Sequence, residues 1–257
     1  MYPDIDNGHI YPKNCRAKQK IAIVIPYRNR ETHLHQWLLN VIPLLRRQQA
    51  DATIFVSEQA EVENFNRGMM KNIGFIEATK YDQFDCVVFN DVDYVPEDDH
   101  NIYQCLSQPN HMAGRPKKKG YKLYYGGFTG GIISFRTDVF KGINGYSNKF
   151  FVWGGEDDNL GKRIKKAGLS ISRPLYNVSH CTTLRHKVDK RQPLRLKILQ
   201  ETNRNLETEY DGINTSKYII SSLDNKKLYI RILSIIKKVD NMGEYEKSLA
   251  KNLTLNL

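Results

Sequence analysis

The sequence contains no long apolar segment. No run approaches the roughly 20 apolar residues that a membrane-spanning helix needs. Residues 1–12 also lack the apolar core of a secretory signal peptide. The sequence alone therefore predicts either a cytosolic protein or a chain from which a targeting segment is missing.

Cysteine is scarce, with four residues in 257, and none of them belongs to a C-x-x-C pair. Structural zinc sites usually rely on such pairs, so the pattern argues against one. Cys86 and Cys105 are close enough in sequence to close a loop in an oxidising compartment. Their spacing leaves open whether they are bonded.

Acidic residues are outnumbered by basic ones, 28 against 39, which gives a formal net charge of +11. This surplus favours acidic ligands such as nucleotides, phosphorylated substrates or sulfated glycans, or a membrane surface. The basic residues are spread along the chain and lack the interleaved aromatics of a nucleic-acid-binding patch. We therefore do not expect nucleic acid as a partner.

Apolar runs alternate with amphipathic stretches in the first hundred residues. Residues 20–26, 52–57 and 86–89 have the β-branched composition of buried strands, whereas residues 33–47 and 64–80 repeat apolar side chains at helical spacing. Alternation of strands and helices predicts an α/β fold, with a mostly parallel central sheet flanked by helices.

The rest of the chain is less regular. We expect a short helix over residues 101–106, a strand over 132–135, a helix over 160–167, and two late strands over 218–222 and 228–236. Residues 191–209 are polar with helical potential.

Asp91 and Asp93 follow the predicted strand at residues 86–89. On a continuing strand they point the same way, because side chains alternate between its two faces. Open α/β sheets bind ligands at the carboxyl ends of their strands, where two carboxylates suit a divalent cation that also holds a diphosphate. The alternative is an exposed turn, since Asp is common in turns.

Cationic and acidic side chains follow other predicted strands or begin helices. Arg28 and Arg30 are placed to meet a phosphate or base, or else are solvated loop residues. The cationic run at 115–120 suits a diphosphate, or is an ordinary solvated loop. The acids at 156–158 begin a helix, where they favour the helix dipole, and they also suit a general base with a sugar-hydroxyl ligand.

Seven short motifs occur in a fixed order along the chain. They are PYRNR at 26–30, FNRG at 65–68, FNDVD at 89–93, YYGG at 124–127, WGGEDD at 153–158, RP at 173–174 and LRH at 184–186. Together they resemble the animal β-1,4-galactosyltransferases of glycosyltransferase family 7, between residues 20 and 191. The resemblance implies a GT-A fold, in which one α/β domain binds a nucleotide sugar through a D-x-D metal motif.

The resemblance divides the chain and assigns it a donor site. The residue pattern predicts an irregular segment at 1–19 and a polar tail at 237–257, with no second globular domain between them. With the resemblance, residues 20–236 are expected to form a single catalytic domain, in which 20–115 are the nucleotide-binding half and 116–236 the donor-sugar and acceptor half. Phe65 and Arg67 would flank the uracil, and Trp153 would close over the donor sugar. The full donor set is Pro26, Tyr27, Arg28, Arg30, Phe65, Arg67, Asp91, Val92, Asp93, Lys118 and Trp153.

The same resemblance assigns the catalytic base, the metal ligands and a disulfide. Asp157 would be the catalytic base, with Glu156 beside it gripping a substrate hydroxyl. Asp93 and His186 would bind Mn²⁺. Thr183 stands where many members have Met and is a further candidate ligand; because a hydroxyl is harder than a thioether, Mg²⁺ is expected to be tolerated too. Cys86 and Cys105 match cysteines that form a disulfide in several members.

Substrate choice follows from the same comparison. Tyr124, which is followed by a second aromatic, would crowd the C2 substituent of the donor and favour UDP-galactose. The implied acceptor set is Tyr124, Gly126, Gly127, Gly154, Gly155 and Asp158. The resemblance thus implies inverting transfer of galactose to the 4-hydroxyl of a terminal N-acetylglucosamine on a glycoprotein, glycolipid or proteoglycan.

Several alternatives stay open at this level. They are an N-acetylgalactosaminyltransferase that uses UDP-GalNAc, a xylose-directed galactosyltransferase, and an inactive, lectin-like relative. The family resides in the Golgi lumen, which is the expected location; a soluble cytosolic or secreted form is the alternative.

Overall fold

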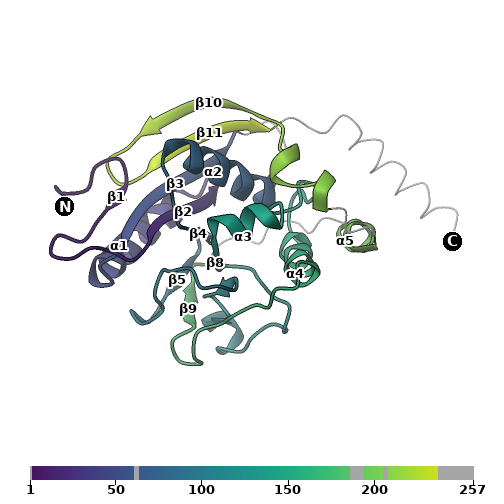
Figure 1. Ribbon diagram of the computed structural model, residues 1–257, viewed down its shortest axis with the longest axis horizontal. Helices are drawn as coiled ribbons and strands as arrows, with labels where there is room; N and C mark the ends of the chain where they lie inside the picture. The colour runs from purple at the N-terminus through teal and green to yellow at the C-terminus, as the bar shows by residue number, and fades with distance from the viewer. Residues whose placement is uncertain (1, 61–63, 186–193, 205–207, 237–257) are drawn as a thin grey trace, which may run out of the picture.

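The computed structural model describes residues 2–60, 64–185, 194–204 and 208–236 (Figure 1). Its main sheet has the strand order β10-β11-β3-β2-β4-β8-β6, with β1 paired to β3. These strands are β1 (His9–Ile10), β2 (Lys20–Tyr27), β3 (Asp51–Gln59), β4 (Cys86–Asn90), β6 (Asn110–His111), β8 (Ile132–Arg136), β10 (Tyr218–Asn225) and β11 (Ile230–Ile236).

The central strands of the sheet run parallel. β11 pairs with β3, β3 with β2 and β2 with β4 in parallel register. The flanking strands β10, β8, β6 and β1 are all antiparallel to their neighbours. The α/β fold class is therefore confirmed, with a parallel centre and antiparallel edges.

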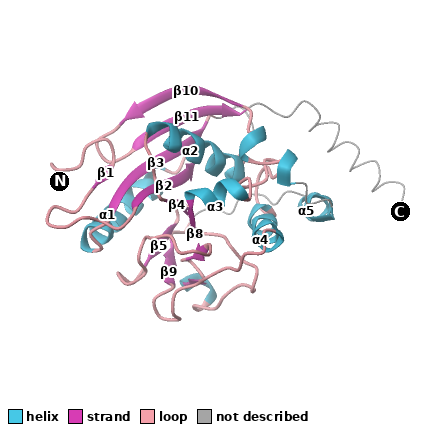
Figure 2. Cartoon of the chain, viewed as in Figure 1, coloured by secondary structure: helices cyan, strands magenta, loops and turns pink. Residues whose placement is uncertain are grey.

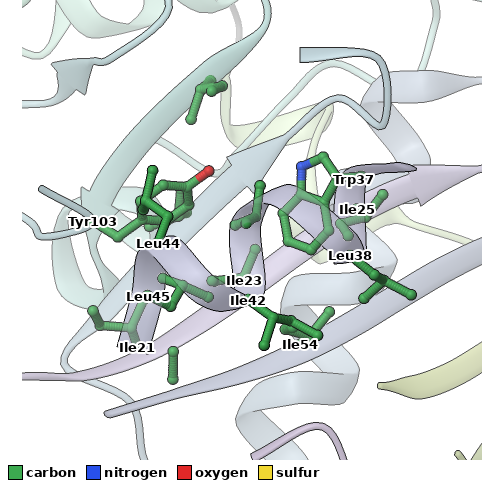
Figure 3. Packing of buried hydrophobic residues seen from close by; sticks show 14 of the residues in the cluster. Ile21, Ile23, Ile25, Trp37, Leu38, Ile42, Leu44, Leu45, Ile54 and Tyr103 are labelled. Atoms are coloured by element: carbon green, nitrogen blue, oxygen red, sulfur yellow. The ribbon is translucent and has the colours of Figure 1, made fainter. Parts of the chain in front are cut away.

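Helices cover both faces of this sheet. They are α1 (Glu31–Arg47), α2 (Arg67–Tyr81), α3 (Thr137–Gly142) and α4 (Glu156–Lys166), with α5 (Arg195–Arg204) packed near α4. Figure 3 shows the α1 side, where Trp37 and Leu45 belong to the same buried cluster as Ile23 of β2. Val24 faces the other way, into the cluster beneath α2. Burial on both faces explains why the β2 segment is continuously apolar.

Helix α2 lies unusually close to the sheet. A Cβ atom on Gly74 would come within 2.4 Å of Val24 Cγ1 and 3.0 Å of Ser57 Cβ, so only glycine permits this approach. The helix begins after Asn66, whose side chain accepts a hydrogen bond from the Met69 N–H at 2.9 Å. The start of α2 is thereby fixed near the carboxyl ends of the parallel strands.

A second, smaller sheet lies in the loop-rich part of the molecule (Figure 2). It has the order β5-β9-β7, formed by β5 (Tyr94–Pro96), β9 (His180–Thr183) and β7 (Arg115–Pro116). Short 3₁₀ turns occur at Lys117–Lys119, Thr208–Tyr210 and Ile213–Thr215. This sheet joins the segment after Asp93 to the segment that leads towards His186.

The helix expected at residues 101–106 is absent, and that prediction was wrong. The segment forms neither helix nor strand there. The Gln19 side chain donates to the Cys105 carbonyl and accepts from the Cys105 N–H, both at 2.9 Å. A disulfide joins Cys105 to Cys86 in β4. These contacts satisfy the backbone of Cys105 without a helix.

The other predicted elements occur near their expected positions. Strands β8, β10 and β11 and helix α4 overlap the ranges predicted for them, and α5 falls within the polar stretch at 191–209. The polar tail at 237–257 lies outside the described residues. Among the helices that the structure describes, none is long and apolar enough to cross a bilayer.

Candidate functional site

A cavity of about 910 Å³ opens at the carboxyl ends of β2 and β4. Loops from both sheets and the start of α4 form its wall. The predicted site residues that line it are Pro26, Arg28, Arg30, Phe65, Arg67, Asp91, Val92, Asp93, Lys118, Tyr124, Trp153, Asp157 and Thr183. Segments separated by more than a hundred residues in sequence therefore meet at one edge of the main sheet, as expected for an open α/β fold.

Asp91 and Asp93 lie on a turn rather than on a strand. Strand β4 ends at Asn90, and the Tyr94 N–H donates to the Asp91 carbonyl at 2.9 Å. The Asn90 side chain donates to the carbonyls of Asp91 and Tyr94, which holds the turn in place. The prediction that strand alternation aligns the two carboxylates was wrong. Asp91 is buried, whereas Asp93 is half-buried in the cavity wall.

Buried and part-buried ion pairs surround Asp91 and join α2 to α4. Arg67, the first residue of α2, pairs with Glu156, the first residue of α4, and its Nε lies 3.9 Å from Asp91 Oδ2. Lys71 Nζ lies 3.1 Å from Asp91 Oδ1. Glu156 is buried and does not line the cavity. Glu156 therefore holds the Arg67 side chain in place and does not face the cavity itself.

Asp157 is the acidic residue of α4 that reaches the cavity. Its Oδ1 atom is inaccessible to solvent and has no hydrogen-bond partner among the residues that the structure describes. Burial, together with the neighbouring Glu156 carboxylate, raises the pKa of Asp157 to about 7. A carboxylate with such a pKa is a stronger proton acceptor than an ordinary Asp and is suited to general base catalysis near neutral pH.

Gly130 and Gly131, not Gly126 and Gly127, form the glycine pair that lines the cavity. A Cβ atom on Gly130 would lie 2.5 Å from Asp157 Oδ2, so the backbone can approach this carboxylate only at glycine. By contrast, Gly126 and Gly127 are exposed, with nothing within 4 Å of an added Cβ. Neither of them lines the cavity.

Sequence reasoning missed Phe128. Its ring lines the cavity beside Gly130, with its centroid 4.7 Å from that of Tyr124 and 5.6 Å from that of Tyr125. An aromatic residue two positions before a Gly-Gly pair is a signal that the sequence contains. The sequence analysis instead assigned the sugar-binding role to the earlier pair, Gly126-Gly127, which also follows an aromatic residue.

Arg173 and His111 hold the loop that carries Phe128. The Arg173 guanidinium donates to the carbonyls of Gly126 (2.7 Å) and Phe128 (3.0 Å) and to His111 Nδ1 (3.3 Å). His111 Nε2 lies 2.8 Å from the Gly130 carbonyl. Burial lowers the pKa of His111 to about 3, so its ring is neutral. The Phe128 loop is thus held by two side chains that lie outside the cavity lining.

The cations expected at the nucleotide line the same cavity. Arg28 lies over the Phe65 ring, with its guanidinium carbon 5.2 Å from the ring centroid. Lys118 Nζ lies 5.0 Å from the Tyr94 ring centroid. Tyr27 is instead buried in the core beneath α1 and does not reach the cavity.

Trp153 lies in a loop with unusual backbone geometry. Val152, Gly154 and Gly155 all have positive φ, of 66°, 106° and 105°. The Val152 N–H donates to the Phe65 carbonyl at 2.7 Å, which anchors the loop on the donor side. Trp153 itself is exposed. Neither Gly154 nor Gly155 lines the cavity, and Asp158 accepts a hydrogen bond from the Tyr125 hydroxyl.

The expected metal ligands are only partly described. His186 lies outside the described residues, and the described part of the chain contains no cluster of three His, Cys, Asp or Glu side chains suited to a metal. The Leu184 N–H donates to the Asp93 carbonyl at 2.8 Å, and Thr183 lines the cavity with Asp93. A carboxylate and a hydroxyl are hard oxygen donors, so these two residues fit Mn²⁺ or Mg²⁺.

The disulfide implied by the resemblance is present. Cys86 and Cys105 are bonded across 19 positions, and both cysteines are buried. Of the remaining cysteines, Cys15 is exposed and Cys181 is buried.

Two family models match successive parts of the chain. The model described as the N-terminal region of glycosyl transferase group 7 matches residues 2–106, and that described as the N-terminal domain of galactosyltransferase matches residues 110–187. Human β-1,4-galactosyltransferase 4 is 40% identical over 233 residues, which are 90% of this chain and 67% of that protein. Mouse β-1,4-galactosyltransferase 1 is 41% identical over 234 residues, 90% of this chain and 58% of that protein.

Solved structures of a β-1,4-galactosyltransferase also resemble this chain. The catalytic domain of Drosophila β-1,4-galactosyltransferase 7 in complex with xylobiose has a TM-score of 0.75 and 27% identity, covering 88% of this chain and 98% of that one. A mutant of the same enzyme, solved with manganese, UDP-Gal and xylobiose, has a TM-score of 0.75 and 28% identity with equal coverage. The chain therefore belongs to the β-1,4-galactosyltransferase family of group 7 glycosyltransferases, and it is a galactosyltransferase with the GT-A fold.

Proposed function

We propose that this enzyme transfers galactose from UDP-galactose to the 4-hydroxyl of a terminal N-acetylglucosamine, with inversion at the anomeric carbon. The observation that carries the proposal is Asp157: a carboxylate in the cavity wall, with a raised pKa and a buried oxygen that no other described side chain engages. Because Asp157 lines the cavity, an acceptor hydroxyl bound there would reach its carboxylate.

The proposed chemistry is a single displacement. The acceptor oxygen forms a bond to the anomeric carbon while the bond from that carbon to the UDP phosphate breaks. The hydroxyl proton passes to the Asp157 carboxylate, which is the general base. Arg28, Arg30 and Lys118 line the cavity as cations and stabilise the negative charge that develops on the departing UDP.

The enzyme is proposed to depend on a divalent cation. Asp93 and His186 would hold Mn²⁺, with Thr183 as a further oxygen donor, and Mg²⁺ is expected to substitute in part. When bound, the ion would act as a Lewis acid at the diphosphate. The manganese and UDP-Gal in the Drosophila relative support this assignment.

The donor is proposed to be UDP-galactose because aromatic rings crowd the cavity next to Asp157. Phe128 is the ring beside Gly130, and Tyr124 packs against it. These two residues leave less room for an N-acetyl group than small side chains would. UDP-GalNAc is the alternative donor, to be tested directly.

Xylose is the second candidate acceptor. The Drosophila relative was solved with xylobiose, which favours a xylose-directed activity for this chain as well. The carrier of the acceptor sugar would be a glycoprotein, a glycolipid or a proteoglycan. The Golgi lumen is the proposed location, and the Cys86–Cys105 disulfide supports an oxidising compartment.

The test is a UDP-release assay with purified protein and Mn²⁺. UDP-Gal and UDP-GalNAc are each offered with an N-acetylglucosaminide, a β-xyloside and no acceptor. Release that requires both UDP-Gal and the N-acetylglucosaminide supports the proposal. Faster release with the β-xyloside assigns the second candidate, and faster release from UDP-GalNAc overturns the donor assignment.

A further inference from the structure

Lys71 is a buried lysine that the proposed chemistry does not use. It lies on α2, four residues after Arg67, and its side chain is 1% exposed. Residues four apart lie on the same face of a helix, so α2 directs two cations towards the end of β4. Burying an ammonium group is costly unless it is paired, which indicates that Lys71 has a specific partner.

That partner is Asp91. Lys71 Nζ lies 3.1 Å from Asp91 Oδ1 and 4.9 Å from the centroid of the Tyr146 ring. Burial alone would lower the pKa of Lys71, but the Asp91 carboxylate raises it above its ordinary value, so the ammonium stays charged. Lys71 does not line the cavity, whereas Asp91 does. The lysine therefore contacts this carboxylate on the side that faces away from the cavity.

No other described cation is as well placed to hold Asp91. Among the described ion pairs, the second cation near it is Arg67, whose Nε is 3.9 Å from Oδ2 and whose guanidinium is engaged by Glu156. Four carboxylates gather at this end of the sheet: Asp91, Asp93, Glu156 and Asp157. Without Lys71, Asp91 would be a buried anion beside other anions and would lose its fixed orientation.

We propose that Lys71 is a positioning residue for donor-sugar binding, because it holds the Asp91 carboxylate in place at the cavity wall. The pair with Lys71 engages Oδ1, which is inaccessible to solvent, so Oδ2 is the oxygen left to accept a hydrogen bond from a sugar hydroxyl. The inference rests on the proposed function and on the place close to the donor sugar that the family resemblance implies for Asp91. It predicts that Lys71 acts on the sugar part of the donor and not on the nucleotide.

The test compares affinities for UDP and UDP-Gal, measured by calorimetry with Mn²⁺, and steady-state kinetics on the same preparations. Lys71→Met removes the charge at similar length, and Lys71→Arg retains it. Lys80→Met is the matched control, because Lys80 lies on the same helix, is largely exposed and pairs with Glu77 at 2.7 Å. If Lys71→Met does not fold, Lys71→Gln takes its place.

We expect Lys71→Met to lose about 10- to 100-fold in UDP-Gal affinity, by analogy with the loss caused by removing the outer-shell partner of a metal ligand. UDP affinity and the acceptor KM should stay as in the wild type, Lys71→Arg should recover part of the loss, and Lys80→Met should match the wild type. Equal losses for UDP and UDP-Gal, or no loss, would overturn the inference. A wild-type protein that does not bind or use UDP-Gal would instead refute the proposed function.

Discussion

Arg67 and Glu156 form an ion pair that joins the first residue of α2 to the first residue of α4, across 89 positions of sequence. Their side chains are 17% and 3% exposed. This contact brings the donor end of the cavity, at Phe65, to the catalytic end, at Asp157. The two halves of the site are therefore connected by a part-buried charge pair.

Removing Arg67 is predicted to destabilise the protein strongly. Arg67→Met leaves Glu156 buried without its partner, which typically costs about 3–5 kcal/mol. The measurement is the free energy of unfolding in urea. Arg136→Met is the control, since it breaks the exposed pair with Asp138 and should cost less than about 1 kcal/mol. Similar losses for the two variants would contradict the assigned role.

Asp157 is predicted to control the pH dependence of the reaction. Its pKa is raised to about 7, and only the ionised form accepts a proton, so kcat/KM should fall as the pH drops below about 7. Asp157→Asn should abolish transfer at every pH. A variant with residual transfer and an unchanged acid limb would show that another group is the base.

The same carboxylate should affect stability in the metal-free protein. A raised pKa means that the folded state binds the proton more tightly than the unfolded state, so this contribution is complete at low pH and is lost as the pH rises from about 3.8 to about 7. Asp157→Asn should therefore gain stability relative to the wild type across this interval. Urea unfolding at several pH values measures the difference.

Phe128 is predicted to select the donor. Phe128→Leu opens space beside Gly130, so the ratio of UDP-GalNAc to UDP-Gal use should rise about tenfold or more, as expected for a pocket that loses bulk. Tyr121→Leu is the control because Tyr121 stacks on His180 outside the cavity lining. If Tyr124→Leu changes the ratio and Phe128→Leu does not, Tyr124 is the selecting residue.

Loss of the Cys86–Cys105 disulfide is predicted to destabilise the fold. A crosslink that closes a loop of 19 positions stabilises by about 3 kcal/mol through the entropy of the unfolded chain. The double variant Cys86→Ala/Cys105→Ala should lose about this amount in urea unfolding. A reducing agent should destabilise the wild type but not the double variant, and Cys15→Ala should behave as the wild type does.

The sequence predicted the centre of the fold better than its edges. The apolar run at residues 20–26 indicates burial on both faces, and β2 is indeed covered by α1 and α2. The direction of β8 was not predictable, because side-chain periodicity is the same in parallel and antiparallel strands. The non-helical segment at Cys105 is held by Gln19, a contact between residues 86 positions apart.

The residues of the site could likewise be predicted from the sequence only in part. The spacing of Asp91 and Asp93 indicated paired acids at a strand end, but the turn depends on the Asn90 side chain. Two Gly-Gly pairs occur four residues apart, and only packing against Asp157 distinguishes Gly130 from Gly126. Lys71 has the sequence appearance of an ordinary helix-surface lysine, because its partner becomes a neighbour only in the folded protein.

The most direct test of the central claim is the structure of the product. Wild-type protein is incubated with UDP-Gal, Mn²⁺ and an N-acetylglucosaminide, beside Asp157→Asn, and the product is examined by NMR. The account predicts galactose joined through a β linkage to the 4-oxygen, formed by the wild type and not by the variant. An α-linked product, or equal yields from both proteins, would contradict inverting transfer with Asp157 as the base.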